Sequence, residues 1–173
     1  RNTYDGRPNA YDSVSQLLAD VQLAAESLRA NRGINAGYHV VRRFLQRIHT
    51  FGFHLATLDV CQHASVHREV LAQGFGEESH RTADVKTRMQ RLRRALERDE
   101  GPSGTFDAVG RRTLAVFETM MHARHKYGER AIGEYIISGA EHAEDVLGVL
   151  VLTRWAGVAN RRTGEAPFHL VPL

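Results

Sequence analysis

FGFHLATLDVCQHASVHR, residues 51–68, is the stretch that decides the fold of this chain. From 53 to 60 the side chains are largely apolar on both alternating faces, which is typical of a parallel strand covered by helices on each side. Polar residues begin only where this strand ends and a helix follows. Because ligand sites of parallel α/β folds lie at the carboxyl ends of the strands, the first candidates for chemistry are Asp59, Cys61, Gln62 and His63.

Helices are predicted on both sides of this strand. Apolar residues recur at helical spacing between capping residues and glycines. The predicted helices run from Asp12 or Ser13 to Gly33, from 36 to Gly52, from 63 to about 73, from 83 to 98, from Asp107 to near Gly128, and from 144 to 155. Gly74 and Gly76 are expected to close the third of these helices. Irregular structure is predicted for residues 1–11, EESHRT at 77–82, GPSG at 101–104 and RRTGEAP at 161–167.

Two further strands are predicted, at 134–138, where Tyr135 begins a β-branched run that ends at Ser138, and at 168–171. Every strand leads into a helix or the end of the sequence, so the predicted class is helix-dominated α/β. We expect one segment, 1–173, of a TIM-like barrel, with its three strands parallel and adjacent. Three strands cannot close a barrel, and exposed strand edges favour partners or self-association.

Composition narrows the functional classes. The 173 residues are 42% hydrophobic and 25% charged with a formal net charge of +3, which is ordinary for a globular protein. The basic cluster of residues 88–98 has no aromatic stacking residues or nucleic-acid motif beside it, so it indicates a solvated helix face. Cys61 is the only cysteine, which excludes an intrachain disulfide. The sequence shows neither a membrane span nor a signal peptide, and a cytoplasmic protein is expected.

Three stretches carry a resemblance to a known family. FGFHLATLDV, followed by Gln62 and then His67, is similar to the FGFHLATLDVRQ segment of phosphoenolpyruvate carboxylase, in which a His also follows. EYIISGAEHAEDVLGVLVL at 134–152 resembles that family's YIISMA and SDVLAV stretch. FHLVPL at 168–173 resembles the lead-in to its VPLFET. The three occur in the family's order and span most of the chain, which is expected to be an internal fragment or a truncated homologue.

The resemblance implies an enzyme that joins phosphoenolpyruvate to bicarbonate with Mg²⁺ or Mn²⁺, giving oxaloacetate and phosphate. It also places Cys61 where the family has the Arg that holds the substrate phosphate, and Gly139 where it has a Met. Gln62 and Ser138 are then expected to bind substrate. A thiol cannot replace the guanidinium fork. We therefore expect this chain alone to be inactive and to bind no metal, since the family's metal-binding carboxylate would follow Leu173.

Other interpretations of the same residues are weaker. Cys61 could be a nucleophile, but no protease signature surrounds it, and a small buried thiol fits better. His63 and His67, or His122 and His125, have the spacing of metal-binding pairs, yet the Glu of a metalloprotease motif is absent. The alternative function is a non-catalytic helical interaction domain that keeps the carboxylase scaffold, without nucleic-acid or membrane partners.

Overall fold

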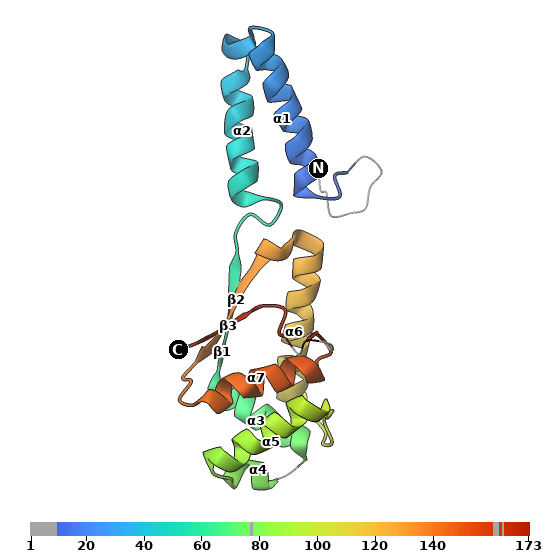
Figure 1. Ribbon diagram of the computed structural model, residues 1–173, viewed down its shortest axis with the longest axis vertical. Coiled ribbons are helices and arrows are strands. Elements are labelled where there is room, and N and C mark those ends of the chain that lie inside the picture. Colours follow the sequence, from blue (N-terminus) through green and yellow to red (C-terminus); the bar gives the residue numbers. More distant parts are fainter. Residues whose placement is uncertain (1–9, 77, 161–162, 164) are drawn as a thin grey trace. The chain divides into compact units, whose positions relative to one another are not determined.

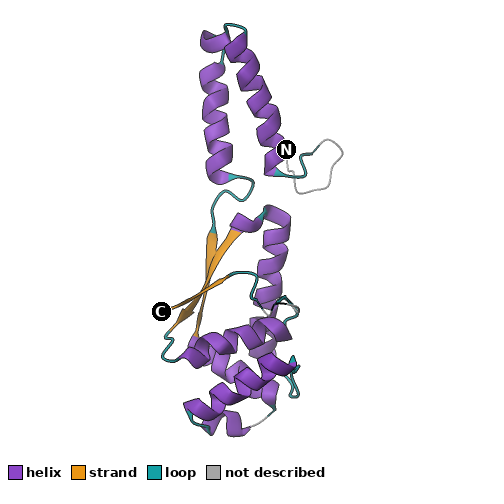
Figure 2. Cartoon of the chain, in the orientation of Figure 1, coloured by secondary structure: helices purple, strands orange, loops and turns teal. Residues whose placement is uncertain are grey.

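The computed structural model describes residues 10–173 apart from 77, 161–162 and 164. Along the chain the elements are α1 (Val14–Ala30), η2 (Gly33–Asn35), α2 (Tyr38–Phe51), β1 (Leu58–His63), α3 (Ala64–Phe75), α4 (Glu78–Thr82), α5 (Val85–Arg98), α6 (Ala108–Tyr127), η3 (Glu129–Ala131), β2 (Ile132–Ser138), α7 (Ala143–Trp155) and β3 (His169–Pro172) (Figures 1 and 2). This confirms the predicted helix-dominated α/β class. Within the described residues, no helix is long and apolar enough to cross a bilayer.

The three strands form one parallel sheet in the order β1-β2-β3, as predicted, and it is not closed into a barrel. Val60 to His63 pair in register with Tyr135 to Ser138. Leu170 pairs with Tyr135 on the other side of β2. Because both neighbours run parallel to β2, all three carboxyl ends lie at the same edge of the sheet.

One face of the sheet holds the core. Tyr135 and Ile137 are almost fully buried, and the Tyr135 ring lies 5.1 Å from that of Phe117 on α6. The same cluster takes buried side chains from α3, α5 and α7, namely Ala64, Val70, Leu71, Leu92, Ala95, Val149, Val151 and Leu152. The other face carries residues that are exposed or half-buried, so the expected covering of β1 on both sides is wrong for this chain.

The predicted first strand also begins too early. Residues 53–56 form turns and a bend, and only from Leu58 does the chain pair with β2. Gly52 ends α2 by donating its N–H to the Ile48 carbonyl, and the Leu55 N–H then donates to Phe51. These local bonds occupy backbone groups that a strand would need. Leu55 consequently lies at φ 64° with its side chain 74% exposed.

Two helical details differ from the sequence prediction. The segment predicted as a loop at 77–82 contains the short helix α4, where the buried His80 ring packs 4.9 Å from Phe75; Glu77 lies outside the described residues. Gly74 does not close α3 but lies inside it, and Gly76, at φ 66°, is the C-cap. The predicted caps Ser13, Asp107 and Gly52 all act as expected. The predictions for residues 1–9 and for much of RRTGEAP fall outside the described residues.

The chain divides into two compact units. One comprises Leu58–Ala123 and Ile132–Leu173 and contains the sheet with its helices. The other contains α1, η2, α2 and the 124–131 stretch. In this second unit α1 and α2 form a helical hairpin, in which Ala25 and Ile48 are buried. Val40 and Phe44 lie on the outer side of α2 and are 71% and 46% exposed.

Candidate functional site at the carboxyl ends of the strands

The carboxyl edge of the sheet brings His63 and Ser138 together. They are direct partners in the parallel ladder, and both lie on the open face of the sheet. Beyond Ser138 the chain turns at Gly139, and the Ala140 N–H donates to the Leu173 carbonyl at 2.9 Å. The three strand ends are thus joined by backbone hydrogen bonds, which fix the position of their side chains relative to one another.

The sequence candidates on β1 do not all meet at this edge. Cys61 lies on the same face as His63 but two residues further from the carboxyl edge, where it pairs with Ile136 of β2. Gln62 pairs with Ile137 and lies on the opposite, helix-covered face, since successive strand residues alternate. Asp59 is further still from the edge, and its Oδ1 accepts the Glu134 N–H at 2.9 Å. Of the candidates on β1, only Cys61 and His63 therefore lie near the edge on the face that carries Ser138.

Cys61 is exposed, so the expectation of a buried thiol is wrong. The reason is the alternation of side chains along β1: Val60 and Gln62 lie on the face that packs against the helices, and Cys61 lies on the other face. An exposed side chain at this position could reach a bound ligand. The thiol has none of the five N–H donors that a guanidinium would present there.

His63 has a defined orientation. As N-cap of α3, its Nδ1 accepts the Ser65 N–H at 3.2 Å and lies 2.8 Å from the Ser65 hydroxyl. The ring lies against Gly139, at φ 65°, so closely that a Cβ built on Gly139 would be 2.6 Å from Nε2. A glycine is therefore favoured at 139 for two reasons: the backbone has a positive φ, and the His63 imidazole leaves no room for a Cβ.

The loop after β2 is held by a buried carboxylate. Asp145 on α7 is 2% exposed; it accepts the N–H groups of Glu141 and His142 at 3.0 and 3.2 Å and binds Arg68 of α3 at 2.8 Å. Burial alone would raise the pKa of Asp145, but these hydrogen bonds and the Arg68 charge outweigh it and hold the pKa below its usual value. Arg68 also contacts Glu141 at 3.2 Å. The pair ties the strand-end loop to α3.

A second buried contact lies beneath the edge. Nε2 of His67 is 2.8 Å from the hydroxyl of Tyr135. Burial lowers the pKa of His67 to about 4, against the opposing effect of the Asp145 charge, and burial raises the pKa of Tyr135. Both groups are therefore neutral at pH 7. Their hydrogen bond aligns α3 with β2.

These positions do not make the predicted histidine pair a metal site. His63 caps α3 while His67 points into the core toward Tyr135. No group of three or more His, Cys, Asp or Glu side chains able to hold a metal occurs within the described residues. The exposed imidazole of His63 and the hydroxyl of Ser138 at this edge are groups that can donate hydrogen bonds to a ligand.

The basic cluster on α5 is only partly the solvated face that we expected. Arg88 is half-buried against α7, where its guanidinium binds Glu144 at 2.6 Å with side-chain exposures of 19% and 3%. Arg94, at 63% exposure, agrees with the prediction and pairs with Glu100. The Arg88 contact joins α5 to α7, so it is structural.

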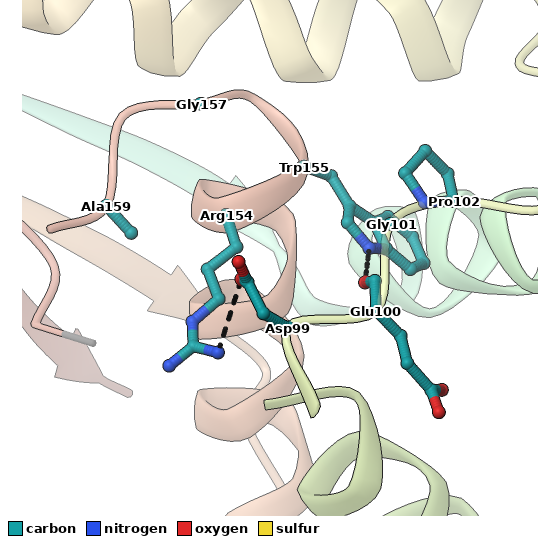
Figure 3. A pocket seen from close by; sticks show the side chains of 8 residues that line it. All are labelled: Asp99, Glu100, Gly101, Pro102, Arg154, Trp155, Gly157 and Ala159. Carbon is teal, nitrogen blue, oxygen red and sulfur yellow. Dashed lines mark hydrogen bonds and ion pairs between the residues drawn. The ribbon is translucent and has the colours of Figure 1, made fainter. Parts of the chain in front are cut away.

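A pocket of about 210 Å³ lies at the other end of α7 (Figure 3). It is lined by Asp99, Glu100, Gly101, Pro102, Arg154, Trp155, Gly157 and Ala159. Arg154 is held by Asp99 at 3.6 Å and by the Leu96 carbonyl. The Trp155 N–H donates to the Glu100 carbonyl at 3.0 Å. These contacts fasten the 99–102 loop to the end of α7. The pocket is also remote from the carboxyl edge, because α7 leads away from it.

Sequence reasoning missed the contacts that position the edge. Arg68, Asp145 and Tyr135 come from elements far apart in the chain, and only the fold brings them together. One sequence signal was present: Asp145 stands three residues after His142, the spacing of a capping box. The role of Arg68 had no such signal.

The fold and the edge together define a class, a parallel α/β segment whose candidate ligand-binding groups lie at the carboxyl ends of its strands. A family model described as phosphoenolpyruvate carboxylase matches residues 2–173. The chain belongs to the phosphoenolpyruvate carboxylase family.

Individual relatives agree with this assignment. A phosphoenolpyruvate carboxylase of Xanthomonas euvesicatoria is 40% identical over 171 residues, which cover 99% of this chain and 19% of that protein. The enzyme of the same name from Chromobacterium violaceum is 30% identical over 94% of the chain, and that of Parasynechococcus marenigrum is 28% identical over 94%. The chain spans 16–19% of the length of these relatives.

Proposed function

We propose that this chain forms part of the substrate-binding edge of a phosphoenolpyruvate carboxylase, which converts phosphoenolpyruvate and bicarbonate to oxaloacetate and phosphate. The observation that carries the proposal is the family match over residues 2–173. The parallel sheet supports it, because His63, Ser138 and Cys61 share the open face near the carboxyl ends of β1 and β2. By resemblance, Cys61 occupies the position of the phosphate-binding Arg.

The edge can supply hydrogen-bond donors to an anionic substrate. The Ser138 hydroxyl and the His63 imidazole are both such groups. Gln62, our other substrate-binding candidate, lies on the covered face and on this proposal acts by supporting β1. Without a guanidinium at position 61 the edge lacks one fixed positive charge. We propose that the 173-residue chain has no carboxylase turnover by itself, and that it lies with the remainder of a longer enzyme or with further copies of itself.

The activity can be tested by exchange with the Xanthomonas euvesicatoria relative. Its matching 171-residue stretch is replaced by this chain, and oxaloacetate formation is followed with phosphoenolpyruvate, bicarbonate and Mg²⁺. The chimera should fold and show a kcat/KM for phosphoenolpyruvate at least about tenfold below that of the host, because a charged hydrogen bond contributes about 1.5–3 kcal/mol. Cys61→Arg in the chimera should recover most of the loss. If the chimera folds and Cys61→Arg does not raise its kcat/KM for phosphoenolpyruvate, the proposed position of Cys61 at the substrate phosphate is contradicted.

The alternative, a non-catalytic interaction domain, has one observation in its favour. α2 carries an outward stripe of Val40, Phe44 and Phe51, each at least 44% exposed, and Arg43 and Arg47 are close to it on the helix. Such a stripe is typical of a surface that another chain covers. A stable, monodisperse 173-residue chain, together with a chimera that is inactive even with Cys61→Arg, would favour this function.

A further inference from the structure

We propose that His63 is the side chain that contacts the substrate's phosphate at this edge, in place of the arginine that Cys61 has replaced. The inference rests on the proposed function and adds a residue to it. Its basis is the position of His63 at the last residue of β1, opposite Ser138, with an exposed imidazole against Gly139.

The hydrogen bonds of His63 determine where its proton lies. The backbone N–H of Ser65 can only donate, so its 3.2 Å contact assigns Nδ1 the role of acceptor, and the Ser65 hydroxyl at 2.8 Å can donate to the same atom. With this assignment Nδ1 carries no proton in the neutral ring. The proton is then on Nε2. Among the described residues Nε2 has no hydrogen-bond partner, so this N–H is available to an acceptor. Nε2 bears its N–H whether the ring is neutral or charged, so His63 can donate to a phosphate oxygen in either state.

Gly139 makes this placement of the ring possible. A side chain at 139 would begin 2.6 Å from Nε2 and 3.0 Å from Cε1, so its Cβ would displace the imidazole. Both departures from the family pattern therefore involve His63. Gly139 leaves room for the imidazole ring. Cys61 removes the guanidinium, and on this proposal the His63 ring contacts the phosphate instead. Ser138 lies on the same face and offers a second donor.

The charged groups near the edge pair with one another, so they do not compete with His63 for a phosphate ligand. Arg68 is engaged by Asp145 and Glu141, and Glu141 in turn has its charge partly balanced by Arg68. Cys61 and His63 are two strand residues apart, about 6.6 Å along β1. An arginine side chain at 61 is long enough to span that distance, so the two positions can serve the same oxyanion.

The test uses the full 173-residue chain with ¹⁵N-labelled histidine. Long-range ¹H–¹⁵N spectra should show the Nε2–H tautomer for His63, and titration with inorganic phosphate, then phosphoenolpyruvate, should shift its Nε2 resonance. In calorimetry at low salt, His63→Asn should weaken phosphate binding about tenfold. Asn is itself a favoured N-cap, so α3 should still begin correctly. Gly139→Ala should weaken binding in the same direction.

His169→Asn is the matched control. His169 is also an exposed histidine on the open face, 86% exposed, but it lies at the amino end of β3, and its replacement should leave phosphate binding unchanged. If His63→Asn binds like the unaltered chain while Cys61→Arg binds more tightly, the role of His63 is wrong and the proposed function stands. If no folded variant binds phosphate, including Cys61→Arg, then both the role of His63 and the proposed function are wrong.

Discussion

Asp145 shows at the scale of one residue how the edge is held. Its carboxylate is buried and satisfies two backbone N–H groups as well as Arg68. Asp145→Ala should lower the free energy of unfolding by about 3 kcal/mol, because it leaves buried donors unpaired. Arg94→Ala, which breaks the exposed pair with Glu100, should cost less than about 1 kcal/mol. Urea denaturation at pH 7 measures both, and equal losses would contradict the role of Asp145.

His67 should make stability depend on pH. Burial holds its pKa at about 4 in the folded chain, whereas in the unfolded chain it is near 6.5. Below pH 6.5 the unfolded state therefore binds a proton that the folded state excludes, and stability falls by about 1.4 kcal/mol per pH unit until pH 4. Comparing urea midpoints at pH 7 and pH 5, His67→Gln should show a smaller drop. An identical drop would mean that His67 does not cause it.

Some of these residues could be predicted from the sequence and others could not. The positions of Cys61 and Ser138 near strand ends could be predicted, because the carboxyl end of a parallel strand is visible as a change from apolar to polar residues. The face on which Gln62 lies, and the exposure of Cys61, depend on the strand register, which the nearly uniform apolar pattern of 53–60 does not specify. The Arg68–Asp145 contact joins residues 77 positions apart and has no local signal.

At the scale of the elements, Gly74 explains how α3 and α7 approach each other. A Cβ on Gly74 would lie 2.1 Å from the Trp155 ring, so Gly74→Ala should destabilise the chain by about 2–3 kcal/mol through overpacking. Gly101→Ala is the control, since a Cβ there meets nothing within 4 Å. Thermal unfolding followed by Trp155 fluorescence measures the difference. If Gly74→Ala is as stable as Gly101→Ala, the close packing is incorrect.

The helices were easier to predict than the first strand for a local reason. Ser13, Asp84 and Asp107 each accept N–H groups from their own first helical turn, so their signals lie within a few residues. The start of β1 depends instead on where the turns after Gly52 finish and on pairing with β2, 75 residues away.

At the scale of the whole molecule, the chain presents an open sheet. Within the described residues β1 pairs only with β2, and Leu58 on β1 is 61% exposed. Exposed strand edges associate, so sedimentation velocity should show the chain self-associating as its concentration rises, and Leu58→Lys should reduce this. Leu23→Lys, at a 68% exposed position on α1, should have little effect. Equal association by the Leu58→Lys chain would rule out this edge as the contact.

The carboxyl edge of this sheet is, on our proposal, a phosphate-binding site that lacks one cation, and calorimetry of Cys61→Arg tests this most directly. Both chains are titrated with phosphoenolpyruvate at low salt, because salt screens an exposed charge. We predict at least about tenfold tighter binding by Cys61→Arg, since a guanidinium adds charged hydrogen bonds, and no turnover by either chain. Equal binding by a folded Cys61→Arg chain, or none, would contradict the proposal.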